Sequence, residues 1–356
     1  MWGYSWEAGQ SKQVVFRTSN KHIHELSVIK GGTWEHADLT AITGAPPVKF
    51  LGNGYSWEAK SKQVVFQTVT GHIHELYMIK GGKWQRADLT DITGAPPAKY
   101  IVNGYSWEAG QSKQVVYGTQ NGHIHELYVV KGGTWQQADL TAITGAPPAK
   151  YIVNGYSWEA GQSKQVVYGT QNGHIHELSV VKGGAWQHAD LTTMAGVPVA
   201  WTIGKGYSWK AGQSKQVVYG TQNGHIHELS MVKGGTWQHA DLTAMVGAPT
   251  NGTILNGYGW EAGQSKQVAY DLSDGHIHEL HMIKGGAWQD ADLTAMAGAP
   301  ISGTLIGNCY SWEAGQSKQV VYKTVDGHIH ELYVVKGWNW NHADLTAITE
   351  APPAND

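Results

Sequence analysis

Residues 104–149 read GYSWEAGQSKQVVYGTQNGHIHELYVVKGGTWQQADLTAITGAPPA, and close copies of this segment fill the chain. The copies recur about every 51 residues across 356 residues, and no insertion between them is large enough to hold another domain. One copy has too little apolar surface to fold alone, so the copies must pack against one another. Seven tyrosines open the seven copies: Tyr4, Tyr55, Tyr105, Tyr156, Tyr207, Tyr258 and Tyr310.

Each copy contains four short segments rich in Val, Ile, Tyr and Trp between turn signals, a pattern that favours strands over helices. Asn121-Gly122 and Gly132-Gly133 separate the later segments, where tight hairpins need residues that tolerate positive φ. Pro147 and Pro148 end the fourth segment, because proline cannot donate to a sheet ladder. In the third copy the strands are predicted at 105–109, 113–119, 123–131 and 134–141.

Four antiparallel strands in each of seven copies predict an all-β fold, a seven-bladed β-propeller with about 51 residues per blade. The second and third strands are apolar on both faces, as expected when each sheet lies between two others. A linear β-solenoid is the alternative, but its end repeats usually differ from the middle ones, and here they do not. We expect blade seven to pack on blade one without exchanging a strand. The single domain, residues 1–356, divides into blades at approximately 3–53, 54–103, 104–154, 155–205, 206–256, 257–308 and 309–356.

Composition excludes several classes of partner. The formal net charge is −3 and no run of Lys or Arg occurs, which argues against nucleic acid as a partner. Cys309 is the only cysteine, so an internal disulfide and a cysteine-based metal cluster are excluded. The sequence contains no membrane-spanning apolar run and no visible signal peptide, so we expect a soluble protein without membrane insertion. We expect synthesis in the cytoplasm and leave a later release open, and the sequence does not indicate the oligomeric state.

Two histidines alternate in the third strand of every copy, which places both imidazoles on one strand face. An Asp of the ADLT segment could join them to bind a metal ion, or the three groups could form a buried hydrogen-bond network or contact a ligand. We favour the network and predict neither a metal nor another cofactor. The groups are His22/His24/Asp38, His72/His74/Asp88, His123/His125/Asp139, His174/His176/Asp190, His225/His227/Asp241, His276/His278/Asp292 and His328/His330/Asp344.

Tryptophan and glutamate each form two repeated series. The first Trp series, which begins at Trp6, lies in the first strand and is expected to pack between blades. The second series opens the fourth strand, where an indole can either offer its face to a sugar ring or pack against the blade as an ordinary apolar side chain. The Glu of each HEL segment needs a partner, either a Lys or amide of the protein or the hydroxyls of a carbohydrate. A second Glu series, which begins at Glu7, and the Lys of each SKQ segment are expected at the solvent surface.

At KQVVYxTxxGHIHEL followed by GGxW, the repeat resembles the fucose-binding propeller lectins of fungi and bacteria. Lectins of the Photorhabdus type are similar in blade number and in repeat uniformity. In the fucose-binding family an Arg of the second strand and a Glu of the third hold the sugar between adjacent blades, beside aromatic rings. This chain has Gln at the Arg position, and an amide donates differently from a guanidinium, so the resemblance implies carbohydrate binding more than fucose specificity.

Carried over residue by residue, the resemblance implies three ligand-binding positions in every blade. The Gln position is Gln13, Gln63, Gln114, Gln165, Gln216, Gln267 and Gln319. The Glu position is Glu25, Glu75, Glu126, Glu177, Glu228, Glu279 and Glu331. The Trp position is Trp34, Trp84, Trp135, Trp186, Trp237, Trp288 and Trp340.

The predicted function is that of a multivalent lectin with up to seven equivalent sites in the grooves between blades, which binds glycans or glycoconjugates, fucosylated ones included. Weak single sites become effective when linked, and uniform copies fit that use. No catalytic triad or phosphate-binding loop is recognisable, so no catalytic residue is predicted and the protein is not expected to be an enzyme. The alternatives are a lyase or hydrolase with one axial site that could use a metal, and a protein-interaction scaffold.

Overall fold

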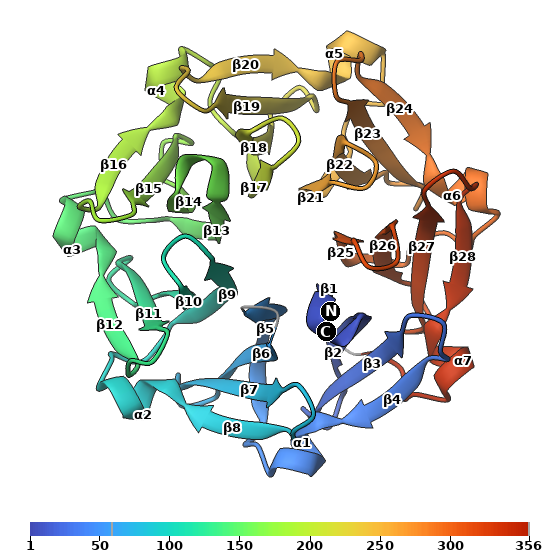
Figure 1. Ribbon diagram of the computed structural model, residues 1–356. Coiled ribbons are helices and arrows are strands. Elements are labelled where there is room, and N and C mark those ends of the chain that lie inside the picture. The colour runs from blue at the N-terminus through green and yellow to red at the C-terminus, as the bar shows by residue number, and fades with distance from the viewer. Residues whose placement is uncertain (58–59, 355–356) are drawn as a thin grey trace.

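The computed structural model describes residues 1–57 and 60–354. Within these residues the chain forms seven four-stranded antiparallel sheets arranged radially around a central axis (Figure 1). In every sheet the strands follow chain order from the axis outward, so each sheet is a meander. This arrangement confirms the predicted seven-bladed propeller, and the blades are numbered here from the N-terminus.

The strands at each position of the blade have similar lengths. The innermost strands are β1 (Trp2–Trp6), β5 (Val48–Trp57), β9 (Tyr100–Trp107), β13 (Tyr151–Trp158), β17 (Thr202–Trp209), β21 (Thr253–Trp260) and β25 (Thr304–Trp312). The second strands are β2 (Ser11–Arg17), β6 (Ser61–Thr68), β10 (Ser112–Gly118), β14 (Ser163–Gly169), β18 (Ser214–Gly220), β22 (Ser265–Asp271) and β26 (Ser317–Lys323). The third strands are β3 (Ile23–Ile29), β7 (Ile73–Ile79), β11 (Ile124–Val130), β15 (Ile175–Val181), β19 (Ile226–Val232), β23 (Ile277–Ile283) and β27 (Ile329–Val335). The outermost strands are β4 (Glu35–Asp38), β8 (Gln85–Asp88), β12 (Gln136–Asp139), β16 (Gln187–Asp190), β20 (Gln238–Asp241), β24 (Gln289–Asp292) and β28 (Asn341–Asp344).

A short helix follows each outermost strand and lies at the periphery of the ring (Figure 1). These helices are α1 (Leu39–Thr43), α2 (Leu89–Thr93), α3 (Leu140–Thr144), α4 (Leu191–Ala195), α5 (Leu242–Val246), α6 (Leu293–Ala297) and α7 (Leu345–Thr349). Short 3-10 turns also occur at Glu7–Gly9 and Glu159–Gly161. Among the described residues, no helix is both long and apolar enough to cross a membrane.

The fourth strand is shorter than predicted, because a helix begins before its predicted end. In the third blade, Asp139 Oδ1 accepts a hydrogen bond from the backbone N–H of Ala142 at 2.9 Å, and Gly145 has a φ of 65°. An Asp at the N-cap and a left-handed Gly after the last turn are favourable helix boundaries. The strand predicted at 134–141 therefore ends at Asp139, and the innermost strand begins at Tyr100, earlier than predicted.

Alternation along the strands gives each blade two different faces. In the third blade the register places Tyr105, Gln114 and Glu126 on one face, and Lys113 and His125 on the opposite face. Because the blades are packed side by side, the Gln and Glu face of one blade meets the Lys and His face of the next. Between the first two blades, Val15 and Leu39 pack against Val64 and Leu76, all fully buried.

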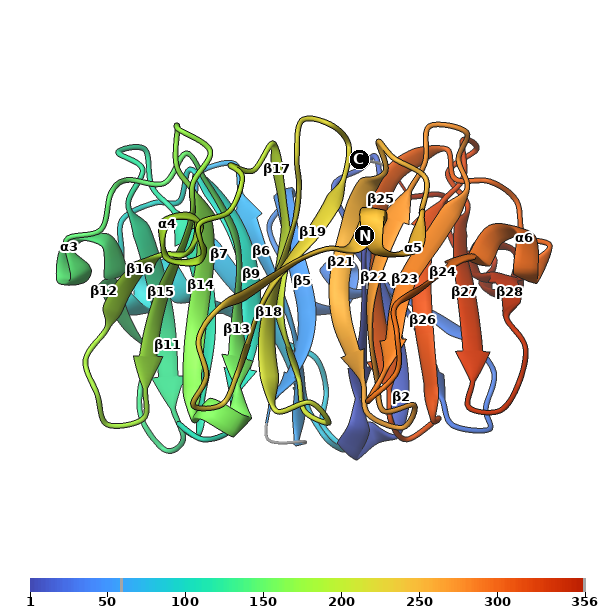
Figure 2. The ribbon, with the colours of Figure 1, turned by 90° about the horizontal axis from the view of Figure 1, so that it is seen from above.

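The connections between strands divide the propeller into two rims, between which the strands run (Figure 2). The hairpin rim carries the turns from first to second and from third to fourth strand. The linker rim carries the turns from second to third strand, the starts of the helices and the links between blades. In the third blade the N–H of Ala149 donates to the carbonyl of Gly122 at 2.9 Å, which fixes the link against the second turn.

Blade seven closes the ring on blade one without strand exchange, as expected. Strands β1 to β4 form one sheet and β25 to β28 form another. Across the junction, Asn308 Oδ1 accepts from Gly3 N–H at 2.5 Å, and Lys12 Nζ lies 2.6 Å from Glu331 Oε2. These contacts have counterparts between other pairs of blades, so closure uses the same chemistry as the rest of the ring.

A belt of asparagines surrounds the axis. Asn103 is typical, since its side-chain amide both accepts from and donates to the backbone of Gly155 in the next blade, at 2.8 Å each. At two positions of the belt the asparagine is replaced by another residue, namely by Trp2 and by Lys205. The Lys205 ammonium lies 3.9 Å from the centroid of the Trp2 ring, and both line an axial cavity of about 160 Å³. Burial lowers the pKa of Lys205 to about 8.

Candidate ligand site in the grooves between blades

The groove between the first and second blades contains a cavity of about 350 Å³ near the hairpin rim. This volume falls at the lower end of the range of small-ligand sites. Its walls combine an indole, an amide, hydroxyls, a carboxylate and an apolar thioether. They include Trp6, Gln13, Ser27, Thr33 and Glu35 from the first blade, and Lys62 and Met78 from the second.

Two buried polar atoms of this cavity have no hydrogen-bond partner among the described residues. Gln13 is fully buried, and its Nε2 donates to Ser11 Oγ at 2.5 Å while Oε1 is unpartnered. The Nε1–H of Trp6 is also unpartnered, although the ring is only 6% exposed. Buried polar atoms are almost always hydrogen-bonded to protein or to ordered water, so these two atoms indicate a place for a water molecule or for a polar group of a ligand. The unpartnered amides are Gln13, Gln63, Gln114, Gln165, Gln216, Gln267 and Gln319, and the unpartnered indoles are Trp6, Trp57, Trp107, Trp158, Trp209, Trp260 and Trp312.

An unpartnered Gln oxygen and an unpartnered indole N–H therefore recur in all seven blades, but the predicted Glu already has partners within the protein. Glu25 is 3% exposed and lies 2.5 Å from Lys62 Nζ of the second blade. It also accepts from the Tyr4 hydroxyl at 2.8 Å, and burial together with this carboxylate raises the pKa of Tyr4 well above its usual value. The equivalent pairs are Lys62/Glu25, Lys113/Glu75, Lys164/Glu126, Lys215/Glu177, Lys266/Glu228, Lys318/Glu279 and Lys12/Glu331.

The expectation that the SKQ lysines lie at the surface is wrong. Lys62 is 4% exposed, and its ammonium lies 5.0 Å from the Trp84 ring centroid and 5.6 Å from that of Trp6. An ammonium between two aromatic faces and a carboxylate is stabilised by cation–π attraction and by the ion pair. The partner that the Glu requires is thus a lysine from the next blade.

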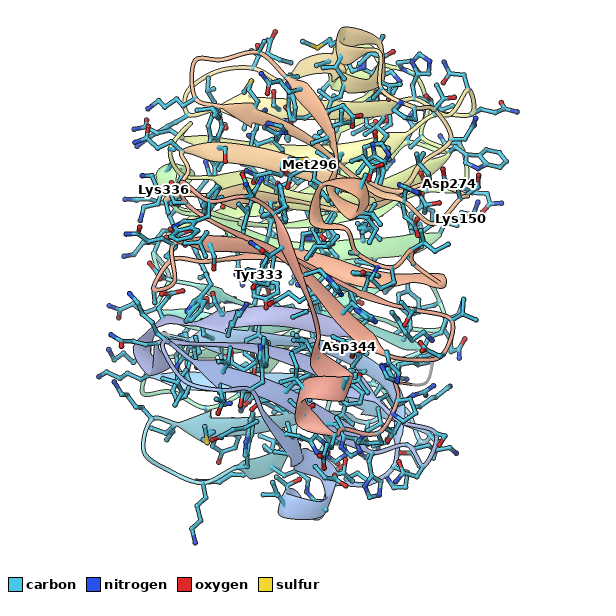
Figure 3. All side chains as sticks on the ribbon, turned by 90° about the vertical axis from the view of Figure 1, so that its right-hand side faces the viewer. Lys150, Asp274, Met296, Tyr333, Lys336 and Asp344 are labelled. Atoms are coloured by element: carbon cyan, nitrogen blue, oxygen red, sulfur yellow. The ribbon has the colours of Figure 1, made fainter. Side chains whose placement is uncertain are left out.

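In each groove the predicted Gln and Glu share one face of the blade, and the Lys that pairs with the Glu lies beside a predicted Trp of the following blade. Of the first set, Gln13 lines the cavity, whereas Glu25 and Trp84 are not among its lining residues. Trp84 and its equivalents are partly exposed, except Trp288 and Trp340, which are 8% and 9% exposed. Figure 3 views the junction of blades seven and one from the side and labels Tyr333, whose ring lies 5.3 Å from Lys12 Nζ. The sets are Gln13/Glu25/Trp84, Gln63/Glu75/Trp135, Gln114/Glu126/Trp186, Gln165/Glu177/Trp237, Gln216/Glu228/Trp288, Gln267/Glu279/Trp340 and Gln319/Glu331/Trp34.

The second Glu series does more than face solvent. Glu7 Oε1 and Oε2 accept from the backbone N–H groups of Glu313 and Ala314 in the preceding blade, at 3.2 and 2.8 Å. Glu159, Glu261 and Glu313 make equivalent contacts, and Glu58 lies outside the described residues. The prediction of a mainly solvated rim is therefore wrong for these carboxylates, which connect adjacent blades.

On the linker rim the predicted His and Asp side chains also meet. His22 Nδ1 lies 2.7 Å from Asp38 Oδ2, and His24 Nε2 lies 4.0 Å from the same oxygen. Burial lowers the pKa of His24 to about 4. Burial acts to raise the pKa of Asp38, but the Ala41 amide and His22 outweigh it, so the pKa is lowered. Two imidazoles and a carboxylate make this the one repeated group suited to a metal ion among the described residues.

Sequence reasoning missed the first Trp series and the wall residues Ser27 and Glu35 as parts of the groove. The Trp6 series is repeated without change, but a core residue in near-identical copies repeats in the same way. Only the unpartnered Nε1–H distinguishes it, and that atom's surroundings depend on the packing of two blades.

No family model matches the chain, and no curated protein matches it in sequence. Among solved structures, the BP39L lectin from Burkholderia pseudomallei superposes with a TM-score of 0.64 at 13% identity over 96% of each chain. The chain has the fold of the propeller lectins. The Aleuria aurantia lectin in complex with Fucα1-6GlcNAc gives 0.52 at 17% identity, over 83% of this chain and 96% of that one. A prolyl endopeptidase gives 0.60 at 11% identity, over 94% of this chain but 49% of that chain. At these identities the likeness concerns the fold alone.

Proposed function

We propose that the protein is a multivalent lectin that binds glycans in the grooves between adjacent blades, at the hairpin rim. The observation that carries this proposal is the buried, unpartnered pair of Gln Oε1 and Trp Nε1–H, present in every blade. A sugar hydroxyl donates one hydrogen bond and accepts others, so the hydroxyls of one sugar can supply the donor that the Gln oxygen lacks and the acceptor that the indole N–H lacks. Leaving both unpaired costs about 1–3 kcal/mol each, which a bound hydroxyl would recover.

The remaining wall groups suit the rest of a sugar ring. Ser27 and Glu35 in the first groove offer a hydroxyl and a carboxylate to further hydroxyls, and Met78 offers an apolar surface. Trp84 is not among the residues that line this cavity, but its ring centroid lies 5.0 Å from the Lys62 ammonium, so we infer that it acts on the site through that lysine. In the same way Glu25 holds the ammonium of Lys62, a residue that lines the cavity.

The proposed ligands include fucosylated glycans, because the Aleuria aurantia lectin of the same fold is described in complex with a fucosylated disaccharide. The uniform Gln lowers the expectation of strict fucose specificity, since a carboxamide lacks the two parallel donors of a guanidinium. Up to seven grooves in one chain would give avidity on a surface that displays many copies of the glycan.

Glycan-array binding followed by titration calorimetry tests this proposal. We expect a hit on the array and more than one equivalent of monovalent glycan per chain. Gln114→Met removes the unpartnered oxygen of one groove and should lower the stoichiometry by about one. Gln120→Met, at an exposed position of the same blade, is the matched control and should leave it unchanged. An absence of array hits would refute the lectin, and one equivalent per chain would favour the axial site of the enzyme alternative.

A further inference from the structure

We propose that the His-His-Asp clusters of the linker rim bind divalent transition-metal ions, one ion per cluster. In the first blade, one ring nitrogen from each of His22 and His24 and one carboxylate oxygen of Asp38 lie within 4.8 Å of one another. The clusters with this spacing include His22/His24/Asp38, His123/His125/Asp139, His174/His176/Asp190, His225/His227/Asp241 and His328/His330/Asp344.

The distances in the first cluster fit an ion with short bonds. The Asp38 oxygen lies 2.7 Å from His22 Nδ1 and 4.0 Å from His24 Nε2. Ligand atoms of a tetrahedral zinc site, with bonds of about 2.0–2.1 Å, lie about 3.3 Å apart, between these two values. Because all three atoms lie within 4.8 Å of one another, binding requires side-chain adjustments of about 1.5 Å or less. The Nδ1 proton of His22 is displaced to Nε2 or to solvent, since a metal takes the nitrogen lone pair.

The buried imidazole is already arranged as a ligand. His24 is 5% exposed, its Nε2 has no hydrogen-bond partner, and its Nδ1 lies 2.7 Å from His36 Nε2. When His36 accepts the Nδ1 proton, the lone pair of His24 Nε2 is directed toward the Asp38 side. Metal-ligating histidines usually donate their other N–H to a carboxylate, a backbone carbonyl or water, which fixes the tautomer and the ring orientation, and here the His36 imidazole would take that role.

The contact between the buried imidazole and a histidine of the outermost strand differs from blade to blade. His188 and His239 lie 2.9 Å from His176 and His227 in the fourth and fifth blades. There Nε2 of His176 and His227 also lies 3.1 Å from a threonine hydroxyl, a contact that an ion would displace. The first blade, where Nε2 is unpartnered, should therefore bind most tightly. The second blade has Arg86 at the His36 position, and its positive charge opposes a cation.

Solvent reaches the clusters. The side chains of His22 and Asp38 are 34% and 27% exposed. In the fourth blade the cluster borders an open cavity of about 400 Å³, whose other walls include Pro147 and Pro148 of the preceding link. In the seventh blade, Asp344 stands at the start of α7, where Figure 3 labels it. Three protein ligands leave a coordination position for water or another ligand.

Two imidazoles and one carboxylate select Zn²⁺, Ni²⁺ or Cu²⁺ over Mg²⁺ and Ca²⁺, which prefer oxygen ligands. The test uses the full, untagged chain after chelator treatment, titrated with Zn²⁺ by calorimetry and assayed for bound zinc after gel filtration. We expect about six ions per chain, from the five clusters given above and one further group that meets the same distance criterion, and no binding heat with Mg²⁺. Fewer than two ions per chain, or equal binding of Mg²⁺, would overturn the proposal.

Single-cluster variants locate the ions. Asp38→Asn keeps an N-cap of comparable quality and should remove one ion, the tightest of the series. His22→Gln, at a more exposed position, serves as a second variant if the first unfolds. His281→Ser is the matched control, since His281 lies outside the clusters and its loss should leave the zinc content unchanged. If neither cluster variant changes the zinc content, the ions bind elsewhere and the assignment fails. These assays contain no glycan, so their outcome is independent of the lectin test.

Discussion

The buried ion pair between Lys164 and Glu126 gives a prediction that separates a structural role for the Glu series from a ligand role. Glu126 is 1% exposed, lies 2.6 Å from Lys164 Nζ and accepts from the Tyr105 hydroxyl at 3.1 Å. Glu126→Ala leaves a buried ammonium without a carboxylate and a buried phenol without an acceptor. Removal of one partner of a buried pair costs about 3–5 kcal/mol, so we expect a loss of about 4 kcal/mol in the free energy of unfolding.

A double-mutant cycle measured by urea unfolding isolates the pair. Lys164→Met should also destabilise the protein, because it leaves the Glu126 carboxylate buried with only the phenol. The double variant should be more stable than either single variant, since replacing both charges with apolar groups is nearly neutral. Gln120→Ala, an exposed change in the same blade, controls for the effect of any substitution and should change stability by less than about 0.5 kcal/mol.

The result that would refute this reasoning is specific. If Glu126→Ala changed the free energy of unfolding by less than about 1 kcal/mol and removed one glycan equivalent, the carboxylate would be a direct ligand of the sugar. The Lys164–Glu126 ion pair would then contribute little to the stability of the fold, and Lys164 would keep its buried position without the carboxylate.

Three further changes test other contacts. Lys205→Asn should extend the asparagine belt by one position through two hydrogen bonds to the backbone of Gly257 and raise stability by about 1 kcal/mol, measured by thermal unfolding; a fall in Tm would contradict it. Because burial lowers the pKa of Lys205 to about 8, the unfolded state holds this proton to higher pH, so stability relative to Lys205→Asn should rise as pH increases from 8 to 10. If the stability difference between the unsubstituted protein and Lys205→Asn, measured by calorimetry, did not change between pH 8 and 10, the Lys205 amine would not be desolvated. Lys210→Glu should reproduce the contact of Glu7 with the preceding blade and stabilise the protein by about 1 kcal/mol, unlike Lys210→Gln as control.

The blade count and the four-strand pattern could be predicted because both follow from local signals, namely residue period, turn residues and proline links. The short helix could also have been predicted from its cap residues, Asp139 and Gly145. Its five residues are too few to show the hydrophobic periodicity of a helix. Burial of Lys113 could not be predicted, because its carboxylate partner Glu75 belongs to the preceding blade. The relative orientation of two blades brings Lys113 to Glu75, and it also determines which indole lies beside the lysine in each groove.

For the candidate site, the sequence and the family resemblance predicted the Gln, Glu and Trp positions, and of the first set Gln13 lines the cavity of the groove. The resemblance implied direct sugar contact by Glu, whereas Glu25 is held by Lys62 and Tyr4. The unpartnered oxygen of Gln13 could not be predicted, since it depends on Ser11 taking up the amide N–H group of the same side chain. Whether a buried polar atom finds a hydrogen-bond partner depends on how the side chains pack, and a pattern of residues in the sequence does not reveal it.

The junction of blades seven and one has no covalent link, and it is held by the same ion pair, asparagine and glutamate contacts that join neighbouring blades. Any link on the linker rim is therefore topologically equivalent to this junction. A circular permutant that joins residues 354 and 1 and opens at another link, such as 146–149, should fold to the same ring. The order in which the blades are synthesised would then have little bearing on the ring that they form.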